Sequence, residues 1–280
     1  MSKGNDTVES DMFDQGAGVQ LTGNIVGNIR RLRSVESPQL RNHRDVLVYL
    51  PPSYPVSGRH YPVVYMHDGQ NLFDHATSYA GEWQVDETME RIASEGYEGI
   101  VIAVPNMGVQ RIAEYSPFRD DRIGGGRGDA YLAFLIDTLK PYVDRHFRTE
   151  RDPAHTGIMG SSMGGLISLY AFLKRPDVFG FAGVMSPSLW FAGGAIFSVA
   201  DERQRWRGRL YLDTGTAEGR RQVRQTREMV RLLRRRALHP RRQIRYVEAR
   251  GAGHNELAWA ARFERAVRWL LPRRRKEINW

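Results

Sequence analysis

The segment Gly160-Ser161-Ser162-Met163-Gly164 has the pattern Gly-x-Ser-x-Gly, with Ser162 at its centre. A serine hydroxyl becomes an effective nucleophile when a sharp strand-to-helix turn exposes it, and small residues two positions away on each side make room for that turn. The pattern follows the apolar run 155–159 and precedes an amphipathic stretch, as such a turn requires. We therefore predict Ser162, rather than its neighbour Ser161, as a nucleophile. The alternative is a glycine-rich turn that only packs a helix against a strand.

A serine nucleophile needs a base and an acid, which follow it in the order Ser, Asp or Glu, His when the pattern lies on this kind of turn. Two histidines follow Ser162, and His239 lies in an arginine-rich turn typical of a surface. His254 lies in the glycine-rich segment "ARGAGHNELAW", where a loop can carry an imidazole to the serine, so we predict His254 as the base. Asp213 and Glu218 compete as the acid. We favour Glu218, because it lies in the loop beyond the strand, whereas Asp213 lies within the strand pattern.

The negative charge that develops on an attacked carbonyl needs two backbone N–H donors. Met163 supplies one at the start of the predicted helix, and Gln70, in the loop after "VVYMHDG", is the candidate for the second. The surrounding segment "HDGQNLFDH" also holds two histidines and two aspartates, so a metal site is the alternative. Their irregular spacing matches no zinc pattern. We predict neither a metal nor any other cofactor.

Aromatic and basic side chains gather in the loops around these residues and could contact a ligand. The candidates for substrate binding are Trp83, Arg111, Tyr115, Phe118, Arg119 and Trp190. Burial of the tryptophans in the core, and a general excess of arginine, is the competing interpretation.

The elements that must position these residues alternate between strand and helix from residue 61 onward. Strands are predicted at 61–69, 99–106, 154–161, 180–188, 208–216 and 242–250, with helices at 83–96, 130–147, from 163, at 219–237 and from 256, and a long loop after 106 that includes 124–129. Two antiparallel strands are predicted before them, at 23–35 and 44–54. This alternation predicts an α/β fold, with a mostly parallel central sheet of about eight strands and helices on both faces. Ligands bind such sheets at the carboxyl ends of the strands, where the candidate residues lie.

Composition limits the remaining possibilities. The 280 residues include no cysteine, which excludes disulfides and thiolate chemistry. The net charge of +9 invites a nucleic-acid interpretation, but only four of the 41 basic residues are lysine, a skew that codon bias explains equally well. We predict a small-molecule partner, no nucleic acid and no membrane. The absence of a signal-peptide pattern and of any run of about 20 apolar residues predicts a cytoplasmic protein.

The sequence divides into three parts. Residues 1–20 are polar and are predicted to be disordered, residues 21–271 are predicted to form one domain of this α/β fold, and residues 272–280 form a basic tail.

Several segments together resemble the "Putative esterase" family of α/β-hydrolases, which includes feruloyl, acetyl-xylan and enterochelin-type esterases and antigen-85 mycolyltransferases. The similar segments span roughly residues 40–271 and are "YMHDGQNLFD" (65–74), Trp83, "VPNMGVQRIAEYSPF" (104–118), "GSSMGG" (160–165), "MSPSLWF" (185–191), "DTGTAEG" (213–219) and "GAGHNELAW" (251–259). The resemblance implies Ser162, His254 and Glu218 as a triad, and the Gln70 and Met163 amides as the oxyanion hole. Relatives often have Asp at the acid position.

The resemblance implies a serine esterase that forms an acyl-enzyme. The aromatic and arginine side chains favour a small aromatic or sugar-linked ester over a long-chain one. The competing hypotheses are an acyltransferase of the same fold and a non-catalytic binding scaffold.

Overall fold

The computed structural model describes residues 24–202 and 206–274. The segment 1–20, predicted to be disordered, lies outside the described residues, as does the predicted tail from residue 275 onward. Within the described ranges no helix is both long and apolar enough to cross a membrane.

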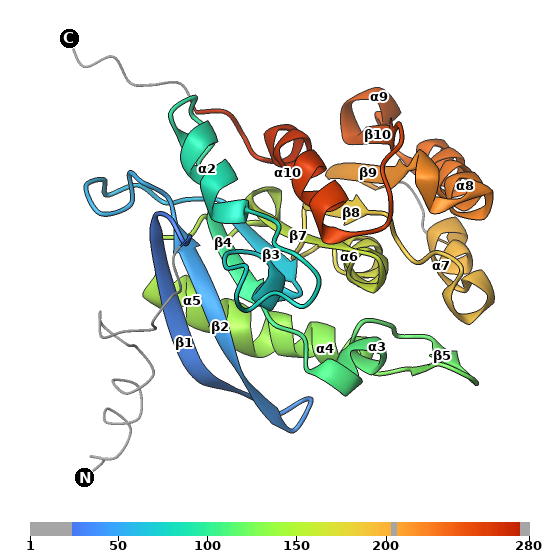
Figure 1. The fold of residues 1–280 in the computed structure, drawn as a ribbon, viewed down its shortest axis with the longest axis horizontal. Coiled ribbons are helices and arrows are strands. Elements are labelled where there is room, and N and C mark those ends of the chain that lie inside the picture. Colours follow the sequence, from blue (N-terminus) through green and yellow to red (C-terminus); the bar gives the residue numbers. More distant parts are fainter. Residues whose placement is uncertain (1–23, 203–205, 275–280) are drawn as a thin grey trace.

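One central sheet of eight strands runs across the described part of the chain in the order β1-β2-β4-β3-β7-β8-β9-β10 (Figure 1). β1 and β2 pair antiparallel with each other, β2 pairs antiparallel with β4, and all later pairs are parallel. The strands are β1 (Asn28–Ser37), β2 (Asn42–Leu50), β3 (Val63–His67), β4 (Ile100–Val104), β7 (Thr156–Ser161), β8 (Phe181–Met185), β9 (Arg209–Gly215) and β10 (Ile244–Ala249). The predicted mostly parallel sheet of about eight strands is confirmed.

Helices cover both faces of the sheet, as predicted. α2 (Val85–Ala93) and α10 (Glu256–Leu270) pack their apolar residues into one core cluster, on the same side of the sheet in Figure 1. The other cluster includes residues of α4 (Gly128–Ala133), η3 (Phe134–Leu139), α5 (Lys140–His146), α6 (Met163–Lys174), α7 (Ile196–Glu202) and α8 (Arg220–Arg236). Because both faces are covered, β3, β4, β7 and β8 are buried along their whole length.

The connection between β4 and α4 contains more structure than the predicted loop. It holds η2 (Gly108–Gln110), the short helix α3 (Arg111–Glu114) and a small hairpin of β5 (Arg119–Asp120) and β6 (Gly124–Gly125). α7, η4 (Pro153–His155), η5 (Phe191–Gly194) and α9 (Pro240–Gln243) were also not predicted. These elements are too short for a hydrophobic period to develop in the sequence.

The arginine-rich helix α8, which lies within the predicted helix 219–237, is amphipathic. Its buried residues are Thr226, Met229, Val230, Leu232 and Leu233, while most of its arginines are exposed. Two of them pair across to neighbouring elements, Arg227 with Glu248 of β10 and Arg236 with Asp201 of α7. The basic face therefore belongs to an ordinary surface helix that also holds its neighbours in place.

Candidate active site

Ser162 lies at the turn between β7 and α6, in a backbone conformation that a side chain rarely adopts, with φ 56° and ψ −119°. The strain of such a turn is typical of functional sites. Two of the glycines around Ser162 lie where any side chain would clash with a neighbouring residue. A Cβ on Gly160 would lie 2.9 Å from His67 Cδ2 and one on Gly165 would lie 2.9 Å from the Met185 carbonyl oxygen. The glycines therefore let α6 approach the ends of β3 and β8 while the turn presents Ser162.

His254 joins Ser162 to Glu218 through one continuous set of hydrogen bonds. His254 Nε2 lies 2.9 Å from Ser162 Oγ, and His254 Nδ1 lies 2.8 Å from Glu218 Oε2. His254 lies between β10 and α10 and is exposed, whereas the Glu218 side chain is only 1% exposed. Asn255, the next residue, caps α10 by accepting a hydrogen bond from the Ala258 N–H, which anchors the loop beside the histidine. The arrangement brings together the three residues predicted as nucleophile, base and acid.

Glu218 is held as a carboxylate by the groups around it. It ends the short helix η6 (Thr216–Glu218) directly after β9, and its Oε1 accepts hydrogen bonds from Ser186 Oγ and the Gly215 N–H. Burial by itself raises the pKa of Glu218, but hydrogen bonds from His254, Ser186 and Gly215 outweigh it and lower the pKa below its ordinary value. A carboxylate that stays ionised beside an imidazole can orient it and stabilise its cationic form.

Asp213, the competing acid, does not contact His254 in the hydrogen bonds described. It is fully buried in β9, where Oδ2 accepts from Arg262 Nε at 2.9 Å and Oδ1 accepts from the Ser186 N–H at 3.2 Å. Burial raises its pKa to about 6, although the neighbouring Arg262 opposes this shift. Asp213 therefore binds Arg262 and Ser186, two residues of the network around Glu218.

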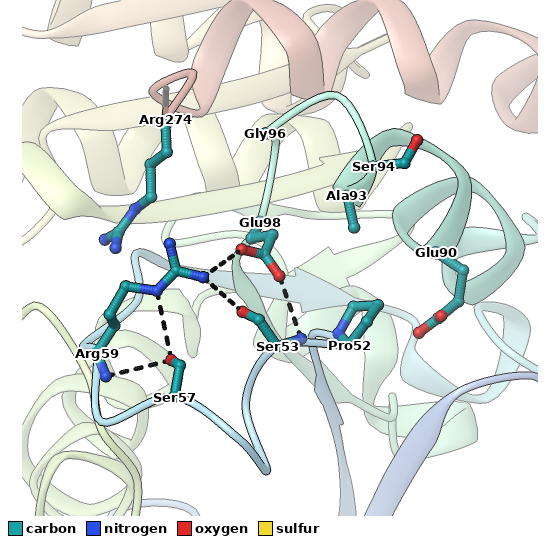
Figure 2. Close-up of a pocket in the computed structure, with 10 residues that line it drawn as sticks. All are labelled: Pro52, Ser53, Ser57, Arg59, Glu90, Ala93, Ser94, Gly96, Glu98 and Arg274. Atoms are coloured by element: carbon teal, nitrogen blue, oxygen red, sulfur yellow. Dashed lines mark hydrogen bonds and ion pairs between the residues drawn. The ribbon is translucent and has the colours of Figure 1, made fainter. Parts of the chain in front are cut away.

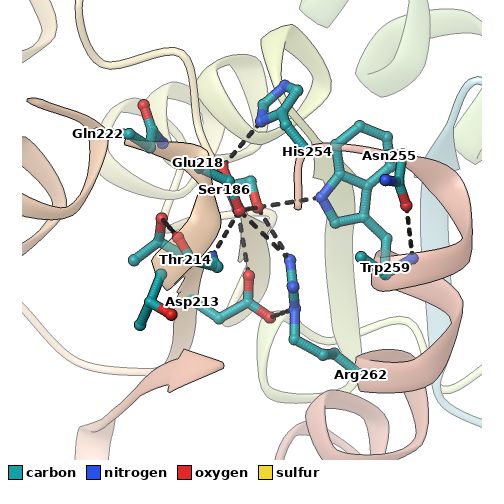
Figure 3. Close-up of polar contacts among 12 residues, drawn as sticks. Ser186, Asp213, Thr214, Glu218, Gln222, His254, Asn255, Trp259 and Arg262 are labelled. Carbon is teal, nitrogen blue, oxygen red and sulfur yellow. Dashed lines mark hydrogen bonds and ion pairs between the residues drawn. The ribbon is translucent and has the colours of Figure 1, made fainter. Parts of the chain in front are cut away.

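Ser186 is the centre of a polar network that sequence reasoning did not identify (Figure 3). Its hydroxyl donates to Glu218 Oε1 at 2.6 Å and accepts from Trp259 Nε1 at 3.0 Å and Arg262 Nη2 at 2.9 Å. The Trp259 ring in turn meets His254 edge to face, with centroids 5.0 Å apart. Glu218 and His254 are thus each in contact with a buried group that limits their movement.

The two predicted oxyanion donors lie at the carboxyl ends of neighbouring parallel strands. Gln70 is in η1 (Gly69–Asn71), directly after β3, and Met163 begins α6, directly after β7. The first N–H groups of a helix have no acceptor within it, so they remain available to a ligand. Gly69 keeps the first of these turns close to the sheet, because a Cβ there would lie 2.6 Å from the Ala103 carbonyl carbon.

The "HDGQNLFDH" segment, considered as a metal site, has other partners. His67 Nδ1 is 2.8 Å from the Tyr131 hydroxyl, and burial lowers the pKa of His67 to about 3. Asp68 accepts two hydrogen bonds from Arg111, at 2.7 and 2.8 Å. These contacts engage His67 Nδ1 and both carboxylate oxygens of Asp68.

The six residues predicted to bind substrate divide into packed and accessible groups. Trp83 is 3% exposed and packs against Trp259 and Phe263, and Tyr115 is fully buried, with its hydroxyl accepting from the Asp68 N–H. Both belong to the core, so the competing interpretation holds for them. Arg111 is half-buried in its ion pair with Asp68. Phe118, Arg119 and Trp190 retain accessible surface, Trp190 with 39%.

A cavity of about 850 Å³ lies elsewhere, at the amino ends of the parallel strands (Figure 2). Its lining comes from the segment after β2, the end of α2 and the turn before β4, together with Arg274. Arg59 there already contacts Glu98 at 3.2 Å and Ser53 at 2.9 Å. The cavity is distinct from the Ser162 site, because that site lies at the carboxyl ends of the strands.

Comparison with known proteins gives a consistent result. A family model described as "Putative esterase" matches residues 37–270. The uncharacterized protein YbbA of Bacillus subtilis is 26% identical over 249 residues, which cover 84% of this chain and 96% of that protein. An endo-1,4-beta-xylanase/feruloyl esterase of Xylanibacter ruminicola is 30% identical over 143 residues, which cover half of this chain but only 19% of that protein.

Two solved structures share the fold at low identity. The BES protein from Bacillus cereus superposes with a TM-score of 0.72 at 17% identity, over 91% of this chain and 99% of that one. The enterobactin esterase FES from Shigella flexneri superposes with a TM-score of 0.71 at 20% identity, over 87% of this chain and 60% of that one.

Proposed function

Because the chain belongs to the putative esterase family, we propose that it cleaves its substrate through a triad of Ser162, His254 and Glu218. The predictions of an α/β-hydrolase fold and of a carboxylic ester hydrolase are confirmed by the family and the similar structures. The observation that supports the triad is the pair of contacts at 2.9 and 2.8 Å that joins the three side chains through His254.

The proposed reaction has two halves. His254 Nε2 takes the proton of Ser162 Oγ while that oxygen attacks the ester carbonyl, and the N–H groups of Gln70 and Met163 receive the negative oxygen. The alcohol leaves with the proton from His254, and the acyl group stays on Ser162. Water then attacks the acyl-enzyme while His254 takes a proton from it. His254 returns that proton to Ser162 Oγ as the acid is released. Glu218 keeps Nδ1–H of His254 in place throughout.

The substrate that we propose is a small ester with an aromatic or sugar-linked part. Trp190 lies two residues beyond Ser188, whose hydroxyl is 3.2 Å from Ser162 Oγ, so this exposed ring belongs to the loop that contacts the proposed nucleophile. The segment of η5 that follows contacts β5, which begins with Arg119. An aromatic face and a guanidinium on neighbouring segments suit an aromatic or hydroxylated group. A relative described as an endo-1,4-beta-xylanase/feruloyl esterase is consistent with this class.

Two variants, each with one of two neighbouring serines replaced by alanine, test the nucleophile. We expect Ser162→Ala to lower kcat for a nitrophenyl acetate by about 10⁶-fold, as for other triad nucleophiles, with unchanged thermal unfolding. Ser161→Ala is the matched control and should keep most of the activity. More than a few per cent of activity in folded Ser162→Ala would refute the assignment.

Assays of the original protein with a panel of esters test the substrate class and show whether water or an alcohol accepts the acyl group. We expect kcat/KM to be higher for feruloyl, acetyl and catecholate esters than for an octanoyl ester, and free acid to be the product in water. A preference for the octanoyl ester would exclude the proposed substrate class. Formation of a new ester with an added alcohol, in place of free acid, would indicate an acyltransferase.

A further inference from the structure

Three carboxylates come together at the start of α2, outside the proposed active site. Glu82, Asp86 and Glu87 each offer one oxygen to a group in which all three oxygens lie within 4.8 Å of one another. Each side chain also has one buried oxygen without a hydrogen-bond donor, namely Oε1 of Glu82, Oδ1 of Asp86 and Oε2 of Glu87. Asp86 itself is completely buried.

Few hydrogen-bond donors contact these three carboxylates, and no cationic side chain of the described residues pairs with them. Asp86 Oδ2 accepts from the Val26 N–H at 2.9 Å, and Glu82 Oε2 accepts from Asn24 Nδ2 at 2.8 Å. Among residues 24–202 and 206–274, no arginine, lysine or histidine forms an ion pair with any of the three carboxylates, although the chain carries a net charge of +9. Buried carboxylates without cationic partners are costly, so the cluster needs a positive ligand or a proton.

We propose that Glu82, Asp86 and Glu87 bind a divalent cation that prefers oxygen ligands, Ca²⁺. Calcium binds oxygen atoms at about 2.3–2.6 Å, so two oxygens that share one ion cannot be more than about twice that distance apart. The 4.8 Å limit of this group satisfies that condition. Acidic residues are common in the first turn of a helix, because they interact favourably with the helix dipole. That interaction explains carboxylates exposed to water, but it does not explain buried carboxylate oxygens without a hydrogen-bond donor.

A shared proton is the competing occupant. Burial raises the pKa of Asp86 to about 8, and the hydrogen bond that a protonated Asp86 would share with the Glu87 carboxyl adds to this shift. A single proton would remove one of the three negative charges, whereas a divalent cation would balance two and coordinate all three side chains. Titration with Ca²⁺ separates these two occupants.

The site has a structural consequence for the neighbouring core. Trp83 follows Glu82 directly and packs against Trp259, with ring centroids 5.9 Å apart. A cation bound by residues on both sides of Trp83 would therefore hold this ring, and the segment before α2, in place. None of the three ligands belongs to the proposed triad, so the cation site can be tested whether or not the proposed catalytic roles are correct.

The test uses the full chain, freed of metal with a chelator and then titrated with CaCl₂ by calorimetry and by thermal unfolding. We expect one Ca²⁺ per chain with a Kd between about 1 μM and 1 mM, and a rise in Tm at saturation. Glu87→Gln and Asp86→Asn should each weaken binding at least about tenfold, and Asp86→Asn can still accept the hydrogen bond from Val26. Glu95→Gln, just beyond the end of α2, is the control and should bind Ca²⁺ like the original protein.

Two results would overturn the proposal. The first is the absence of a one-to-one binding event up to about 10 mM CaCl₂, with an unchanged Tm, which would leave a shared proton as the occupant. The second is an equal rise in Tm for the original protein, Glu87→Gln and Glu95→Gln, which would mean that Ca²⁺ acts elsewhere.

Discussion

Replacing Glu218 with glutamine tests the proposed acid without changing the size of the side chain. In the structure, Glu218 Oε1 accepts from Ser186 Oγ and the Gly215 N–H, while Oε2 faces His254 Nδ1 at 2.8 Å. Glutamine has only one acceptor oxygen. If that oxygen keeps the two donors, the amide NH₂ must point at His254 Nδ1.

That orientation would change the tautomer of the histidine. Nδ1 would have to accept from the amide, so the ring proton would move to Nε2, and Nε2 could no longer accept the proton of Ser162. A triad acid replaced by its amide in this way lowers kcat about 10⁴-fold. At about 1.36 kcal/mol for each factor of ten, this corresponds to about 5.4 kcal/mol of lost transition-state stabilisation.

The matched variant is Asp213→Asn. Asp213 bonds to Arg262 and to the Ser186 N–H but not to His254, so we expect its kcat to fall much less, with a larger effect on stability. The assay is steady-state hydrolysis of a nitrophenyl ester, with the proton on the His254 ring located by nitrogen NMR. The reasoning fails if Asp213→Asn is the slower enzyme, or if Glu218→Gln keeps more than about a tenth of the activity.

Two further predictions follow from the same network. The pKa of Glu218 is lower in the folded protein than its ordinary value of 4.5, so its contribution to stability is complete above that pH and is lost as the pH falls through the folded pKa. Unfolding by urea over this range should therefore show a steeper loss of stability on acidification for the original protein than for Glu218→Gln, and equal slopes would contradict the argument. Ser186→Ala leaves the buried donors of Trp259 and Arg262 without their shared acceptor. Each unsatisfied donor lowers the free energy of unfolding by about 1–3 kcal/mol. We expect lower stability and a lower kcat with little change in KM, and an unchanged kcat would show that Ser186 does not position Glu218.

The sequence was sufficient to predict the sheet and to predict three residues that the structure brings into contact through His254. Ser162 and Glu218 each follow a strand with a strong apolar pattern, His254 follows the last strand, and the order of the strands along the chain limits which loops can meet. Asp213 could not be separated from Glu218 with certainty, because the two differ only in how far they lie beyond the buried part of the strand. The structure separates them by their partners, His254 for Glu218 and Arg262 for Asp213.

Other features depend on contacts that no local pattern contains. Ser186 and Arg262 are 76 positions apart, and nothing in either segment indicates that they meet. The hairpin of β5 and β6 was predicted as a loop, because its strands have two residues each and Gly124 and Gly125 both have positive φ. Trp83 was predicted at the surface of the site from its place in a loop, but the aromatic residues of α10 bury it.

The helix α10 connects the proposed base to the proposed acid. His254 lies one residue before the cap of this helix, so the position of the imidazole depends on where α10 begins. Trp259 and Arg262 are three residues apart and therefore share a face of the helix, from which both donate to the hydroxyl of Ser186. Ser186 in turn donates to Glu218. A change of one residue in the register of α10 would rotate that face by about 100° and remove both donors at once, so the packing of α10 against the sheet sets the geometry of both residues.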